Sequence, residues 1–262
     1  MSASENRYRD DLPAAEHPRS RLALLGFGLA ILALLAAMLA GWGSRFGVWE
    51  FRTGFTVLKW AVYLGIAAAA VSLGGIVATR VGEHRRGIGF ALAGLVVAMA
   101  VVYVPWSWRR TARSVPPIHD ITTDTQDPPA FVAILPLRAD ASNSAEYEGD
   151  SIAALQREAY PDVQPLALDL PPGRAFDAAL EAARGMGWEI HAAEPTDGRI
   201  EATDTTFWFG FEDDVVVRVT PAAGGARVDV RSVSREGGSD VGTNAERIRE
   251  YLAELRDRLA ES

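Results

Sequence analysis

The sequence predicts three membrane-spanning α-helices followed by a soluble α+β domain. Three apolar runs without a charged residue occupy positions 22–40, 60–79 and 87–108. Each run has about the 20 residues that a helix needs to cross the hydrocarbon core of a bilayer. From position 165 onward, short stretches of alternating apolar and polar residues lie between two amphipathic helical patterns. Such a pattern is typical of a sheet that packs against helices on one face.

Composition divides the chain into four parts, which we expect to be a polar N-terminal tail (1–21), a transmembrane region (22–110), a linker (111–130) and a soluble domain (131–262). Prolines flank a polar stretch in the linker, and prolines stiffen such connections. Residues 115–262 carry 13 Lys and Arg against 28 Asp and Glu. A domain this acidic repels nucleic acid, whose binding depends on neutralising phosphates. The excess charge also has a simpler explanation, because net charge keeps a domain soluble.

Three further features describe the membrane region. Five of the seven tryptophans fall on the side of the three helices that leads into the soluble domain, and Trp prefers the headgroup layer. Small residues recur along the second and third apolar runs, where they let helix backbones approach closely, either within one molecule or in a dimer. No Asp, Glu, His or Arg lies within an apolar run. This argues against a transporter or pump, since such proteins use intramembrane charges.

The orientation is predicted from the flanking cations. Seven Arg residues fall on the N-terminal side, and six Arg and Lys residues fall on the other. The positive-inside rule therefore gives a slight preference for a cytoplasmic N-terminus. Three spans then place the C-terminal domain outside the cytoplasm, as in a multi-pass protein of the bacterial inner membrane.

The soluble domain is predicted element by element. A short helical pattern covers 151–159, a strand covers 165–170, and apolar residues recur at helical spacing over 176–183. Four alternating segments follow, at 188–192, 199–207, 215–220 and 227–234. Thr243 and Glu246 have the spacing of a capping box at the start of a last helix. The order strand, helix, four strands, helix predicts an antiparallel meander with both helices on one face. It resembles one half of the TATA-box-binding-protein fold.

Strand alternation places polar residues on the opposite face of the sheet. We interpret this face as open to solvent, and its candidate binding residues are Arg218, Arg231, His191 and Glu201. These side chains could form a docking surface for a protein partner. Alternatively, they form cross-strand ion pairs of about 0.2–1 kcal/mol each with no further role.

Several segments of the soluble half resemble the bacterial and plastid family called domain of unknown function 1499 (DUF1499). The matching segments are residues 117–124 (PIHDITTD), 128–131 (PPAF), 160–162 (YPD), 199–203 (RIEAT), 208–211 (WFGF), 231–235 (RSVSR), 238–242 (GSDVG) and Asn244. The resemblance covers about residues 115–260 and implies no reaction, cofactor or substrate. Some members of the family resemble exported lipoproteins, which implies a location outside the cytoplasm. The chain has no cysteine for a lipid anchor.

The cluster with the strongest resemblance to a catalytic site is His119, Asp120 and Thr123. Histidine titrates near neutral pH and a carboxylate can orient it, so a hydrolase with a Ser or Thr nucleophile is one hypothesis. A capped turn explains the same residues without catalysis. We expect no metal and no cofactor, because this domain has no cysteine, only two histidines and no phosphate-binding loop followed by a helix.

We therefore expect a membrane-anchored envelope protein whose soluble domain is a non-enzymatic binding module. The expected partners are the lipid bilayer and an envelope protein, with nucleic acid excluded. A hydrolase based on His119 and Asp120 is one alternative. The other is a protein that handles lipid at the membrane surface through the aromatic residues near 208–211.

Overall fold

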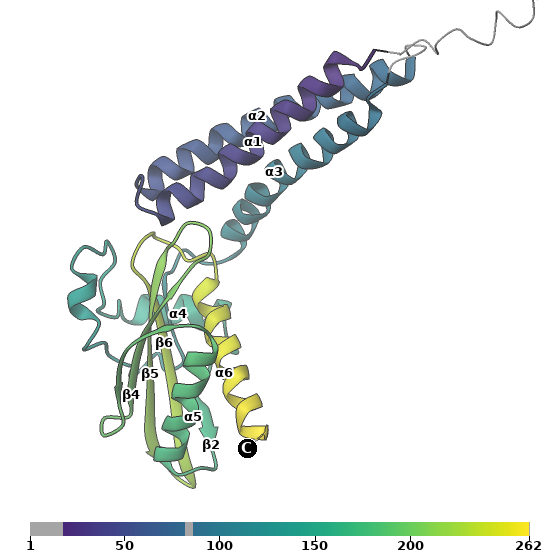
Figure 1. Cartoon of the computed structure of the whole chain (residues 1–262). Helices are drawn as coiled ribbons and strands as arrows, with labels where there is room; N and C mark the ends of the chain where they lie inside the picture. Colours follow the sequence, from purple (N-terminus) through teal and green to yellow (C-terminus); the bar gives the residue numbers. More distant parts are fainter. Residues whose placement is uncertain (1–17, 82–85, 262) are drawn as a thin grey trace, which may run out of the picture. The chain divides into compact units, whose positions relative to one another are not determined.

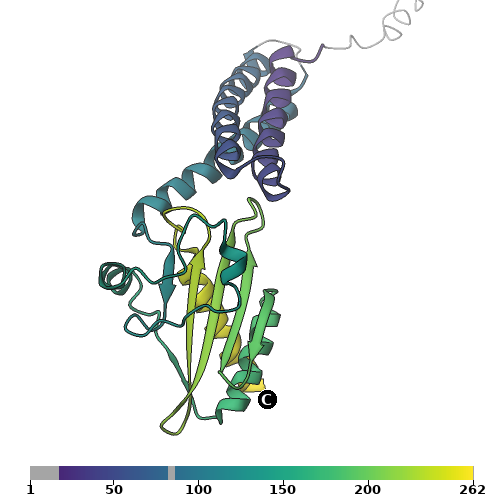
Figure 2. The ribbon, with the colours of Figure 1, turned by 90° about the vertical axis from the view of Figure 1, so that its left-hand side faces the viewer.

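The computed structural model describes residues 18–81 and 86–261. The predicted polar tail therefore lies largely outside the described residues. The chain forms two compact units (Figures 1 and 2). The first combines Glu50–Pro105 with the chain up to Gly41, and the second combines Trp42–Trp49 with Trp106–Ser262. Each unit is described by itself.

The three predicted membrane helices are present and are longer than the apolar runs. They are α1 (Arg21–Arg45), α2 (Phe51–Val81) and α3 (Ile88–Ser114). All three are long and apolar enough to cross a membrane. Polar and aromatic residues extend each helix past its apolar run, because backbone hydrogen bonds can continue through the headgroup region into water. Pro105 lies inside α3, and the boundary between the two units falls directly after it.

Small residues let the helices of the first unit pack closely. A Cβ atom added to Gly94 would lie 2.9 Å from the Cα atom of Phe27 on α1, and one added to Gly75 would lie equally close to Ala23. Ala30, Ala68 and Ala98 form a buried contact between the three helices. Gly74 and Gly89 instead face open space. The glycines at the contacts thus serve packing within one molecule.

We expect Gly94→Leu to destabilise the helix bundle and Gly89→Leu to leave it intact. The two glycines lie on the same helix, but only the first meets a neighbouring backbone, and overpacking at such a site costs about 1–3 kcal/mol. The measurement is the temperature at which each full-length variant loses its monodisperse state in detergent. Equal losses in the two variants would contradict the packing described.

The soluble domain is built on one antiparallel sheet of order β1-β6-β5-β4-β3, with β2 also paired to β6. The strands are β1 (Asp120–Thr122), β2 (Leu166–Leu168), β3 (Glu189–Glu194), β4 (Arg199–Thr205), β5 (Glu212–Ala222) and β6 (Gly225–Ser234). The helices are the 3-10 helix η1 (Leu135–Arg138), α4 (Asp150–Ala159), α5 (Pro172–Gly185) and α6 (Thr243–Glu261). The predicted order from β2 to α6 is confirmed, and β1 is an additional strand.

Helices α5 and α6 pack on one face of the sheet, as predicted (Figure 1). Their apolar residues form the main core with the inward side chains of β4, β5 and β6. Trp188 stacks on Tyr251 with ring centroids 4.9 Å apart, and the Tyr251 hydroxyl donates to the Ala179 carbonyl oxygen. A buried tyrosine thus has its hydrogen-bond partner on the neighbouring helix.

The structure adds detail to two local predictions. Within the stretch 111–130 that the sequence predicts as a linker, α3 continues to Ser114 and β1 begins at Asp120. Strand β1 has only three residues, too few to show the alternating pattern of a strand in the sequence. Its central residue, Ile121, is fully buried. The start of α6 is capped by Asp240, whose carboxylate accepts the backbone N–H groups of Gly242 and Asn244. Asp240 therefore occupies the capping role that the sequence suggested for Thr243.

Candidate functional site

The polar face of the sheet is covered, which corrects the expectation of an open face. Residues 129–147, here called the covering segment, lie across it (Figure 2). Phe131 and Ile134 of this segment pack against Val216 and Val233 of the sheet. Strand alternation shows which side chains share a face, but it does not show whether another part of the chain lies on them.

Glu201 holds the covering segment in place. Its side chain is fully buried on β4. The two carboxylate oxygens accept the backbone N–H groups of Val132, Ala133 and Ile134 at 2.9–3.1 Å. The Arg199 guanidinium lies 2.8 Å away and balances the charge. Charge-assisted hydrogen bonds to three consecutive amides fix the backbone of this loop.

The fixed loop presents aliphatic side chains to solvent. Val132, Leu135 and Leu137 are 51%, 47% and 51% exposed, within six residues of one another. Their neighbours Phe131 and Ile134 point inward and are buried. We call Val132, Leu135 and Leu137 the aliphatic patch. Leucines exposed singly are ordinary on protein surfaces, whereas apolar side chains grouped on an ordered loop are typical of interaction sites.

Arg231, a predicted binding residue, is instead buried and paired. Its guanidinium donates to both carboxylate oxygens of Asp120, at 2.9 and 2.7 Å, and both side chains are 3% exposed. It also donates to the carbonyl oxygens of Pro129 and Ala145. Phe131 packs over the same guanidinium. Arg231 therefore ties β6 to β1 and to both ends of the covering segment.

A second buried ion cluster surrounds Asp214 on β5. Arg138 at the end of η1 and Arg235 directly after β6 donate to its carboxylate at 2.5–2.9 Å. The Thr203 hydroxyl donates to the same carboxylate at 2.7 Å. His191, another predicted binding residue, lies 2.8 Å from the same hydroxyl oxygen through its Nε2 atom. Burial raises the pKa of Asp214, but the hydrogen bonds from Arg235, Thr203 and Arg138 outweigh it, and the net pKa is lowered.

The lowered pKa of Asp214 predicts how the stability of the domain depends on pH. A carboxylate whose pKa is lower in the folded than in the unfolded protein stabilises the fold above the unfolded value of about 3.9. That stabilisation is lost as the pH falls through the lower folded value. We therefore expect the stability advantage of the wild type over Asp214→Asn to be constant from neutral pH to about 4 and to shrink below it. Urea unfolding at a series of pH values measures this difference in unfolding free energy. A difference that grows as the pH falls below about 4 would contradict the lowered pKa.

The structure does not assemble His119, Asp120 and Thr123 into a catalytic arrangement. The Asp120 carboxylate is paired with Arg231, and the His119 ring lies 3.5 Å from Glu148. The Thr123 hydroxyl accepts the Val230 N–H at 2.9 Å. Among residues 18–81 and 86–261, no hydrogen bond joins the His119 ring to a Ser or Thr hydroxyl. The Asp120 carboxylate and the Thr123 hydroxyl instead tie β1 and the residue after it to β6.

Arg218, the remaining predicted residue, lies at the margin of the polar face. Its guanidinium contacts the carboxylates of Asp127 at 2.9 Å and Asp229 at 3.3 Å. Arg227 pairs with Asp229 and with Asp124. Arg218 and its neighbours therefore form the ion pairs that were the alternative to a docking surface.

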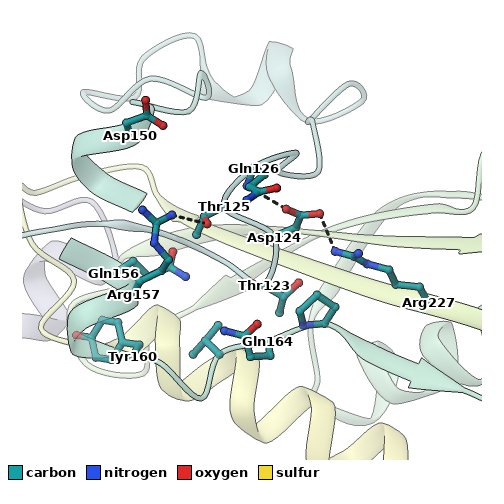
Figure 3. A pocket seen from close by; sticks show the side chains of 12 residues that line it. Thr123, Asp124, Thr125, Gln126, Asp150, Gln156, Arg157, Tyr160, Gln164 and Arg227 are labelled. Carbon is teal, nitrogen blue, oxygen red and sulfur yellow. Dashed lines mark hydrogen bonds and ion pairs between the residues drawn. The ribbon is translucent and has the colours of Figure 1, made fainter. Parts of the chain in front are cut away.

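A polar pocket of about 710 Å³ lies beside this network (Figure 3). Strands β1 and β2 pair with separate parts of β6, and the pocket is lined by the segments that follow β1 and precede β2, together with α4. Arg157 reaches across to the Thr125 hydroxyl, and Asp124 pairs with Arg227 (Figure 3). The lining offers hydrogen-bond donors and acceptors to a polar ligand, and within the described part of the chain no three acidic or histidine side chains converge as metal ligands.

Comparison with known families identifies a match to the soluble domain. A family model described as "Protein of unknown function (DUF1499)" matches residues 120–255. These residues begin at β1 and end within α6, and they make up just over half of the chain. No curated protein matches the sequence.

Proposed function

This chain belongs to the DUF1499 family of proteins of unknown function, and we propose that it is a membrane-anchored protein whose soluble domain is a non-enzymatic module that binds a protein partner. The observation that carries the proposal is the aliphatic patch on a loop fixed by Glu201. A loop already held in one conformation loses little entropy on binding, so more of its contact energy appears as affinity.

The burial of Glu201 supports an interaction role for this loop. Removing a carboxylate from water is expensive unless it is well paired. Here the pairing is made mainly with the backbone of the loop. The result is an ordered segment with apolar side chains on its outer side, where they add nothing to the core. Contact with another protein buries these exposed apolar side chains.

The charge of the domain defines the partner further. Residues 115–262 have more than twice as many acidic as basic side chains. We infer a partner with an apolar surface for the aliphatic patch and a basic surrounding surface, since complementary charge speeds association. The membrane anchor makes an envelope protein the natural class of partner.

We also propose that the N-terminus is cytoplasmic and the soluble domain is outside the cytoplasm. The support is the small excess of arginine on the N-terminal side of the helices, although Arg7, Arg9 and Arg85 lie outside the described residues. A C-terminal reporter fusion tests it directly. Activity of a reporter that works only outside the cytoplasm is expected, and activity of a cytoplasm-specific reporter would reverse the assignment.

Site-specific photo-crosslinking tests the binding role. A photoreactive amino acid at Leu135 or Leu137 should give a discrete crosslinked product with one protein in the native membrane. The matched control is Leu155, an exposed leucine on α4, outside the covering segment. The captured protein must then bind the purified full-length chain. Identical products from positions 135, 137 and 155, or a captured protein that does not bind, would refute the proposal.

A further inference from the structure

The loop between β4 and β5 contains four aromatic residues and no charge. It runs over residues 206–211 with the sequence TFWFGF and is here called the aromatic loop. Phe207 is 80% exposed. The loop closes on itself, because the Phe211 N–H donates to the Thr206 hydroxyl and the Thr206 N–H donates to the Phe211 carbonyl oxygen. Phe207 is thus held outward by an ordered turn and contributes nothing to the core.

Sheet register places this loop at the end of the domain where the chain arrives from the membrane helices. Asp120, the first residue of β1, pairs with Val233 near the end of β6. Ser234 pairs with Asp213 at the start of β5, and Glu212 pairs with Thr205 at the end of β4. Only five residues separate Ser114, the end of α3, from β1. Fully extended, they span at most about 18 Å.

A contact inside the second unit brings the aromatic loop to Trp108, near the end of α3. The ring of Trp208 lies 5.1 Å from that of Trp108, and both belong to this unit. Trp106 and Trp108 are exposed where the apolar run of α3 ends. That is the position at which tryptophan occupies the headgroup layer of a bilayer. A loop that packs on Trp108 is therefore at the same level.

We propose that the aromatic loop inserts Phe207 into the interface of the lipid bilayer, as a second membrane contact of the soluble domain. Phe207 then lies at the boundary between lipid headgroups and acyl chains, where aromatic side chains are favoured. The contact adds to the covalent tether by holding one end of the sheet at the membrane. It is independent of the aliphatic patch and of the proposed protein partner.

The chain has no cysteine, so one introduced cysteine carries one fluorescent label. The experiment uses the full-length protein in phosphatidylcholine vesicles, with an environment-sensitive dye at Thr205→Cys beside the aromatic loop. The control is Ala223→Cys, in the turn at the other end of β5. A third protein combines Thr205→Cys with Phe207→Ser. Nitroxide-labelled lipids quench a dye that touches the bilayer.

We expect lipid quenching at position 205, none at position 223, and a loss of quenching when Phe207→Ser is added. Phe207 is too exposed to affect folding, and an unchanged thermal transition of the soluble domain confirms this for the variant. Quenching at 205 that persists with Phe207→Ser would overturn the proposal, because the tether alone would then explain it. Absence of quenching at 205 would also overturn it. Neither result bears on binding by the aliphatic patch.

Discussion

Glu201→Ala will release the covering segment and strongly destabilise the soluble domain. The substitution leaves three consecutive backbone N–H groups without their acceptor and leaves Arg199 without its 2.8 Å partner. Each unsatisfied buried donor costs about 1–3 kcal/mol. Partial relaxation of the loop into water will recover some of this, so we expect a loss of about 3 kcal/mol in the free energy of unfolding.

Two measurements separate the local from the global effect of Glu201. Hydrogen exchange of the full-length protein in detergent should show faster exchange at the amides of residues 132–134, and urea unfolding gives the change in stability. Glu194→Ala is the matched control, because Glu194 is exposed at the end of β3. Unchanged exchange at residues 132–134 in Glu201→Ala would show that the carboxylate does not hold the loop.

Arg231→Met will be the second severe change, because it leaves the Asp120 carboxylate buried without a cation. Removal of one partner from a buried ion pair costs about 3–5 kcal/mol. The double variant Asp120→Asn with Arg231→Met removes the uncompensated charge. Its loss of unfolding free energy should therefore be smaller than the sum of the losses in Asp120→Asn and in Arg231→Met. The measurement is urea unfolding of the three variants at neutral pH.

An exposed pair of the same chemistry provides the control for Arg231. Arg249 donates to both carboxylate oxygens of Asp162 at 2.6 and 2.9 Å, but both side chains are substantially exposed. Surface pairs are worth about 0–1 kcal/mol, so Arg249→Met should have little effect. Equal effects of Arg231→Met and Arg249→Met would show that burial does not govern the strength of these pairs.

Much of the fold could be predicted from periodic patterns. Long apolar runs identify membrane helices because hydrocarbon demands them, and the alternation from Trp188 to Ser234 identifies the meander because one face must be buried. Strand β1 escaped prediction because three residues show no period. The Asp240 cap escaped because Thr243 offered a more familiar spacing three residues before Glu246.

The candidate site could be predicted only in part. Arg231 and Glu201 were correctly placed on the polar face of the sheet, yet both are buried. The covering segment has no periodicity, and its main attachment uses backbone N–H groups, which are the same in every sequence except at proline. The only sequence signal for the aliphatic patch is the short run FVAILPL at 131–137. Its division into buried and exposed side chains depends on where the backbone is held.

The most direct test of the central claim is the affinity of the crosslinked partner for the purified full-length protein and its patch variants. We expect Leu137→Asp to weaken binding about ten-fold or more, which corresponds to about 1.4 kcal/mol or more and is typical of a central apolar contact. Leu155→Asp on α4 should bind like the wild type. Equal affinities of Leu137→Asp and the wild type would contradict a partner-binding role for the loop that Glu201 holds.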